Sequence, residues 1–226
     1  PFALPNTPPL EKTDQSCRLH RMVPDGAQGG DFLRAMEMSH TGEYILHATG
    51  VKLVASSGTL TELDADAPRP DIIHLSGMKP FALSAKDRQA LRAAIDQGAI
   101  LLTDAYASSP EFTASCRKEL TALFGPLQPL SGENPVALGA FPGGEELHDL
   151  RYNLVARRDL KKRGLHPRGQ SLEVIQVGGR PAVFFSPIDL TGALAGCRSY
   201  QVASYAPDSA RRLLANLVAR TSERGE

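Results

Sequence analysis

Two short apolar runs, each followed by a capped amphipathic helix, lie between residues 71 and 126. The runs are residues 71–75 and 99–103. Apolar runs of this length, bounded by turn signals, are typical of strands that are buried on both faces. Strands that alternate with helices are joined by right-handed crossovers and form a parallel sheet. This stretch therefore predicts an α/β domain.

Local signals mark the ends of both expected helices. Ser84 and Asp87 form a capping box, and Gly98 supplies a left-handed residue at the end of the first helix. Ser109-Pro110 starts the second helix with proline at its favoured first position, and Gly125 ends it. The residues that share one face of these helices are Leu91, Ala94 and Ile95 in the first, and Phe112, Cys116, Leu120 and Leu123 in the second.

The flanking regions extend this pattern. Residues 16–23 and 51–55 are strand-like, and a helix is expected from Asp31 through Tyr44, with a break at Thr41-Gly42. The runs 172–177 and 181–186 are joined by Gly178-Gly179 and predict a β-hairpin. A last amphipathic helix begins at Pro207, whereas residues 130–144 are expected to be loop-like. We expect one open, mostly parallel sheet flanked by helices, flavodoxin- or amidotransferase-like, over residues 16–222.

Composition excludes several classes of function. Lys+Arg 25 balances Asp+Glu 25, tryptophan is absent and aromatic residues make up 6%, so nucleic acid is not an expected partner. No apolar run reaches the ~20 residues of a spanning helix. The phosphate-binding pattern GxxxxGK[ST] is absent, no GxGxxG follows a strand, and the histidines and cysteines lack metal-site spacing. No cofactor and no metal are expected.

The three cysteines, Cys17, Cys116 and Cys197, leave two alternatives. Either all are buried thiols, which is the favoured interpretation, or one pair forms a disulfide and one thiol stays free.

Residues 1–15 contain four prolines within nine residues and predict an extended arm. A start at Pro1 fits an exported, periplasmic chain after signal removal, an excised segment, or Met removal in the cytoplasm. Export is the preferred expectation.

Several short motifs resemble a bacterial family called domain of unknown function 4159. They are, in order, Leu75-Ser76-Gly77, Leu83-Ser84, the strand from Gly98 to Asp104, Phe112 with Arg117 and Glu119, Gly179-Arg180, and Phe185-Ser186-Pro187-Ile188-Asp189-Leu190. The segment 30–54 is similar to the N-terminal part of that family. The resemblance covers most of residues 16–220 and implies a relative of the class I glutamine amidotransferase fold. It implies no assigned activity.

Polar residues follow the expected strands, where ligands of open α/β sheets bind. These candidates for a ligand-binding rim are Ser76, Gly77, Asp104, Tyr106, Ser186 and Asp189. We predict that Ser76, Asp104 and Ser186 lie at the same sheet edge. The alternative for the aspartates and serines is ordinary capping and turn chemistry.

Amidotransferase chemistry needs a thiolate on a sharp strand-to-helix turn. Here that turn is Asp104-Ala105-Tyr106-Ala107-Ser108 and contains no cysteine, while Cys116 lies on the apolar stripe of the next helix. We therefore expect no glutaminase activity. His74 lies within a buried strand, where a hydrogen-bonded core histidine is commoner than a ligand.

The stretch 151–168 is strongly basic, and its candidates for partner binding are Arg157, Arg158, Lys161, Lys162 and Arg163. It is either a solvated loop or a docking surface for an acidic partner or phosphate.

These observations favour a non-catalytic, amidotransferase-like binding or assembly module that works with other protein subunits in an exported complex. The alternative is a hydrolase that uses Asp104 with Ser186 or Ser76.

Overall fold

A computed structural model of the chain describes residues 11, 14–22, 31–59, 69–162, 164, 166, 168–197 and 201–222, with only the backbone of residues 31–39. Its centre is one sheet of seven strands in the order β2-β1-β3-β4-β7-β6-β5. The strands are β1 (Ser16–Met22), β2 (Lys52–Ser57), β3 (Ile72–Gly77), β4 (Ile100–Ala105), β5 (Gln128–Pro129), β6 (Glu173–Val177) and β7 (Arg180–Ser186). The four pairings among β2, β1, β3, β4 and β7 are parallel, and β6 pairs antiparallel with β7 and β5. This confirms the predicted open, mostly parallel α/β fold of flavodoxin-like strand order.

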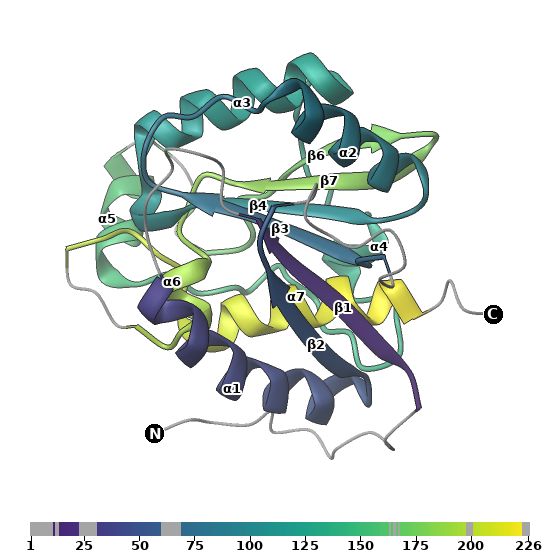
Figure 1. Cartoon of the computed structure of the whole chain (residues 1–226). Helices are drawn as coiled ribbons and strands as arrows, with labels where there is room; N and C mark the ends of the chain where they lie inside the picture. The colour runs from purple at the N-terminus through teal and green to yellow at the C-terminus, as the bar shows by residue number, and fades with distance from the viewer. Residues whose placement is uncertain are drawn as a thin grey trace.

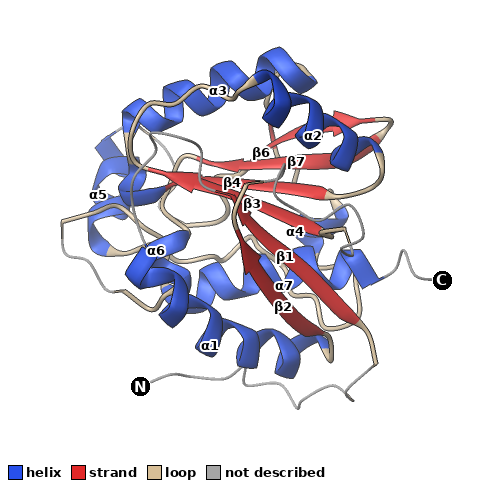
Figure 2. Ribbon diagram, viewed as in Figure 1, coloured by secondary structure: helices blue, strands red, loops and turns tan. Residues whose placement is uncertain are grey.

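Helices cover both faces of the sheet (Figures 1 and 2). The helices are α1 (Asp31–Thr49), α2 (Ala85–Asp96), a 3₁₀ turn η2 (Tyr106–Ser108), α3 (Pro110–Phe124), α4 (Pro135–Leu138), α5 (Leu154–Lys162), α6 (Thr191–Leu194) and α7 (Pro207–Ser222). Helices α2 and α3 lie on one face, and α1 and α7 lie on the other. Each face buries its own apolar cluster, so the sheet is the middle of three layers.

The predicted caps of α2 and α3 are present. Ser84 Oγ accepts from Asp87 N at 3.1 Å and donates to the Asp87 carboxylate at 2.6 Å. Ser109 Oγ accepts from Phe112 N at 3.2 Å. The predicted hairpin is also confirmed, since Gly178 and Gly179 have φ of 59° and 77° between β6 and β7. Two consecutive positive φ angles are the requirement of a type I′ turn, which glycine meets without strain.

The predicted break of the first helix at Thr41-Gly42 is wrong, because α1 continues to Thr49. Thr41 is buried, and its hydroxyl donates to Leu194 O at 3.0 Å. Tyr44 and Ile45 are buried one turn later. This packing against α6 and α7 outweighs the roughly 1 kcal/mol that an interior glycine costs a helix.

The range 130–144, expected to be loop-like, contains the short helix α4, and the basic stretch 151–168, for which a solvated loop was one of two interpretations, contains α5. Only Ala156 and Leu160 of α5 are buried, so its sequence lacks a wide apolar stripe. The helix begins after Asn153, whose Oδ1 accepts from Ala156 N at 2.9 Å.

Helix α7 is largely buried and packs against β1, α1, α4 and α6. Its Asn216 is fully buried, and its amide makes three hydrogen bonds to the backbone of Val136 and Glu145. All three partners are backbone groups in or near α4, so this side chain joins the last helix to the segment around α4.

Candidate functional site

The register of the sheet brings the predicted rim residues into one row. Ser76 of β3 is the partner of Asp104 in β4, and Asp104 is the partner of Ser186 in β7. The three residues come at the carboxyl ends of three neighbouring parallel strands. The prediction that they share one sheet edge is confirmed.

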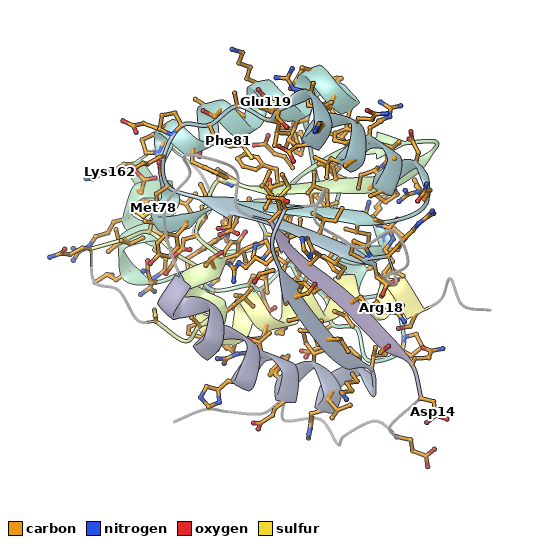
Figure 3. All side chains as sticks on the ribbon, in the orientation of Figure 1. Asp14, Arg18, Met78, Phe81, Glu119 and Lys162 are labelled. Carbon is orange, nitrogen blue, oxygen red and sulfur yellow. The ribbon has the colours of Figure 1, made fainter. Side chains whose placement is uncertain are left out.

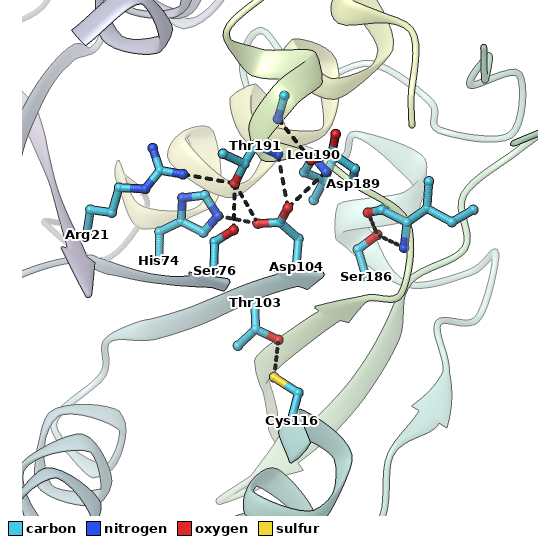
Figure 4. A network of polar contacts seen from close by, with 12 residues as sticks. Arg21, His74, Ser76, Thr103, Asp104, Cys116, Ser186, Asp189, Leu190 and Thr191 are labelled. Atoms are coloured by element: carbon cyan, nitrogen blue, oxygen red, sulfur yellow. Dashed lines mark hydrogen bonds and ion pairs between the residues drawn. The ribbon is translucent and has the colours of Figure 1, made fainter. Parts of the chain in front are cut away.

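The carboxylate of Asp104 is the centre of a buried polar network (Figure 4). Its Oδ1 accepts from His74 Nε2 at 2.7 Å and from the Thr191 hydroxyl at 3.0 Å. Its Oδ2 accepts from the backbone N–H of Leu190 and of Thr191, both at 3.0 Å. An ionised carboxylate has about four lone-pair sites, and here each of them receives a donor.

Thr191 connects this network to two further strands. Its Oγ1 accepts from Arg21 Nη2 of β1 at 2.8 Å and lies 2.8 Å from Ser76 Oγ of β3. Because the single hydroxyl proton of Thr191 goes to Asp104, the proton between Thr191 and Ser76 belongs to Ser76. The hydroxyl of Thr191 is therefore saturated, with one proton donated and two accepted.

The electrostatics of Asp104 favour its ionised form. Burial alone raises the pKa of its carboxyl. The net pKa is nevertheless below its ordinary value, because His74 contributes a hydrogen bond and a charge, the Thr191 backbone donates a hydrogen bond, and Arg21 adds positive charge. Because the carboxylate can only accept, His74 presents a protonated Nε2 to it. In this structure every lone-pair site of the stabilised carboxylate accepts a hydrogen bond from the protein itself, so the network orders the strand ends.

Asp189 is a second buried carboxyl at the same edge, only 3% exposed. Its Oδ1 accepts from Gly192 N at 2.9 Å. Burial and the nearby charge of Asp104 raise its pKa to about 7. Burial raises the pKa of Tyr106 and of Cys197, and the charge of Asp189 raises both further.

The other predicted rim residues have ordinary structural partners. Ser186 Oγ donates to Ile188 O at 2.6 Å and accepts from Ile188 N at 3.2 Å, which closes a local turn. Gly77 is the buried last residue of β3, and Tyr106 is half-buried at the start of η2. The structure thus joins Ser76 and Asp104 through one network by way of Thr191, and places Asp189 and Ser186 beside it.

The strand-to-helix turn after Asp104 is unusual. Ala107 and Ser108 have φ of 55° and 52°, a conformation that side-chain-bearing residues seldom adopt. Ser108 Oγ donates to Ala203 O at 2.5 Å and accepts from Asp189 N at 3.1 Å, so it ties this turn to two later loops. Both roles of its hydroxyl are structural.

All three cysteines are free thiols, and Cys17 and Cys116 are buried as expected, whereas Cys197 is only half-buried. Cys116 lies within α3 and donates to Thr103 Oγ1 at 3.5 Å. Burial raises the pKa of the Cys116 thiol to about 12, and burial likewise raises that of Cys17 to about 12. Neither is a thiolate at neutral pH, and neither lies on the turn after β4.

The basic segment forms one side of a cavity of about 570 Å³. Arg157 and Arg158 are exposed on α5 and line it, together with Arg151 and Arg168. Lys161 and Lys162 are also exposed on α5 but lie outside the lining, and Lys162 projects outward (Figure 3). Arg163 lies outside the described residues.

Sequence reasoning placed Asp104 and His74 correctly but did not foresee the partners that hold Asp104. His74 is a hydrogen-bonded core histidine, as predicted. Arg21 and Thr191 were missed, since each is a common residue type in an unremarkable sequence context. A signal was available in the helix-like start Leu190-Thr191-Gly192 directly after Asp189.

The described part of the chain contains neither a cluster of metal-binding side chains nor a membrane-spanning helix. No group of three or more His, Cys, Asp or Glu residues there could hold a metal ion. No described helix is both long and apolar enough to cross a bilayer.

The fold and the buried rim define an open α/β domain of flavodoxin-like topology whose strand ends are closed by the chain's own residues 188–194. Residues 44–220 match the family described as Domain of unknown function (DUF4159). The chain belongs to that family. No curated protein matches the chain.

Proposed function

We propose that this protein is a non-catalytic, amidotransferase-like binding module that acts as a subunit of a larger assembly. The observation that carries this proposal is the saturated Asp104 carboxylate at the place where an open α/β sheet would hold its reacting groups.

The topology explains why this place matters. The strands β2, β1 and β3 are parallel, but the order in which the chain adds strands to the sheet reverses between β1 and β3. Ligands of such sheets bind beyond the strand ends at that switch point. Here Thr191 bonds to Arg21 of β1 and Ser76 of β3, so it spans the switch point. The following α6 is buried along its whole length. Thr191 and the rest of α6 therefore occupy the crevice in which ligands of such sheets bind.

The hydrolase alternative has weaker support. A nucleophilic serine needs a base within hydrogen-bond reach. Ser76 donates to Thr191 and Ser186 donates to Ile188 O, so neither proton is directed at Asp104. The turn at which an amidotransferase carries its thiolate has Ala107 and Ser108 in its strained positions, and the Ser108 proton goes to a backbone carbonyl.

The catalytic half of the proposal is tested by activity assays on the purified protein. Ammonia release from glutamine and hydrolysis of p-nitrophenyl acetate should stay at the rate of a buffer blank. Turnover that disappears in Cys197→Ala, or in Ser108→Ala with unchanged thermal stability, would show that a nucleophile has been misplaced and would overturn this half.

The assembly half is tested by purification of the tagged protein from its native source. Companion proteins at a constant ratio to this chain are the expected result, and fractionation of the cells would show whether the assembly is exported. A single species of monomer size from gentle lysis, without companions, would contradict it. Deletion of residues 1–13 should weaken the assembly and leave the fold intact, because the deletion keeps Gln15, whose carbonyl accepts from Lys52 N beside β1.

A further inference from the structure

The arginine-lined cavity beside α5 is separate from the Asp104 network and has the chemistry of an anion site. We propose that it binds a small organic molecule through a phosphate monoester group. This inference rests on the proposed binding role, because it assigns a ligand class to a surface of the same module.

Charge is the first argument. Four guanidinium groups from three separate stretches of the chain, at positions 151, 157–158 and 168, line one cavity. The one carboxylate in the lining, Asp208, is already paired with Arg151. Among the described residues no ion pair is formed by the other three arginines. Their combined positive charge matches a phosphate dianion better than a single carboxylate.

The type of basic residue is the second argument. The lysines of α5 lie outside the lining, although Lys161 and Lys162 follow the arginines by one turn. Arginine presents a planar fork that binds two oxygens at once, whereas lysine is a compact point charge. One fork occupies both oxygens of a carboxylate, but a phosphate ester has three terminal oxygens and can accept from several forks.

The ends of two helices add to this field. The first residues of α5, Leu154 and Val155, line the cavity, and so do Pro207 and Asp208 at the start of α7. Helix N-termini carry partial positive charge, which favours anions. These termini supplement the arginines and would not make a site alone.

The cavity also has room and apolar surface for an organic group. Its volume of about 570 Å³ lies within the roughly 300–1,000 Å³ of small-molecule pockets. Leu154 is 50% exposed, which is high for a large aliphatic side chain, and Val155 and Pro207 complete an apolar wall. An acidic protein surface would use the exposed lysines as readily as the arginines, so the lining favours a small ligand.

The test is calorimetric titration with phenyl phosphate, inorganic phosphate and benzoate at low salt. Phenyl phosphate should bind wild type more tightly than either of the other two. Inorganic phosphate lacks the apolar ring, and benzoate lacks the phosphate group. Binding should weaken about 10-fold or more in Arg157→Gln/Arg158→Gln, which loses two charge-assisted contacts. The matched control, Lys161→Gln/Lys162→Gln, removes the same charge from the same helix and should bind within about twofold of wild type.

Both double variants change only exposed side chains, and thermal unfolding checks that they fold. Equal weakening in the two double variants would indicate diffuse electrostatic attraction and would overturn the site. Absence of phenyl phosphate binding, or equal affinity for benzoate, would overturn the ligand class. Release of phenol from phenyl phosphate would instead overturn the non-catalytic function and leave the site standing, so the two failures are distinguishable.

Discussion

The substitution Asp189→Asn should remove a pH-dependent loss of stability from this protein. Asp189 is buried beside Asp104, and burial with the charge of Asp104 raises its pKa from 3.8 to about 7. The folded state therefore holds a proton on Asp189 at pH values where the unfolded chain has lost it. Stability falls as pH rises from about 4 to about 7, because the folded state binds more protons over that range.

The size of the effect follows from the shift. A change of about three units at ~1.4 kcal/mol per unit amounts to roughly 4 kcal/mol, of which about 3 kcal/mol falls between pH 5 and pH 8. Asparagine has the shape of the protonated acid, and its carbonyl oxygen can still accept from Gly192 N. The charged or titratable groups around Asp189 are Asp104, Arg21, Tyr106 and Cys197.

Urea unfolding at pH 5 and pH 8 measures this difference. The histidines contribute to the pH dependence of both proteins, so the relevant quantity is the gap between variant and wild type. The free energy of unfolding of the variant, relative to that of wild type, should increase by about 3 kcal/mol from pH 5 to pH 8. Asp96→Asn, which removes a charge from an exposed carboxylate on α2, is the matched control and should give no such gap. An Asp189→Asn variant that parallels wild type at both pH values would refute the reasoning.

Three further predictions concern the same network. Asp104→Leu should lower the free energy of unfolding by about 3–5 kcal/mol in urea titrations, because it leaves buried donors without their acceptor; a loss below about 1 kcal/mol would contradict the network. Because the pKa of Asp104 is lowered, its contribution is present above about pH 4 and is lost below it, so acid unfolding of wild type should begin there, and the Leu variant should lack this step. Gly192→Ala should be destabilising by thermal unfolding, since its Cβ would lie 2.5 Å from Asp189 Oδ2, whereas Gly132→Ala, where a Cβ meets nothing within 4 Å, should be tolerated.

The central strands of the sheet were predictable from sequence because they are buried on both faces. Ile72–Gly77 and Ile100–Ala105 have no exposed residue, so they read as continuous apolar runs. The glycine pair of the hairpin and the Ser84 and Ser109 caps are also local signals, in which the residues that interact are at most four apart.

The features that were missed depend on distant residues. Helix α5 buries only two side chains, and its start depends on Asn153, which also donates to Val202 O at 2.6 Å. At the rim, the row of Ser76, Asp104 and Ser186 followed from strand register alone. The partners of Asp104 did not follow, since Leu190 and Thr191 are 86 and 87 positions away and use backbone groups that carry no sequence signal.

The position of β7 in the sheet has a consequence for folding. It pairs with β4 along Leu101–Asp104, although 74 residues lie between Ala105 and Arg180. Contacts of this range are slow to form, and a chain emerging from the ribosome cannot make them until β7 has been synthesised. Until β7 is made, β4 lacks its partner on that side, and Asp104 lacks the donors of Leu190 and Thr191. A charged residue at an unpaired strand disfavours pairing with other chains, so Asp104 would protect that edge during synthesis.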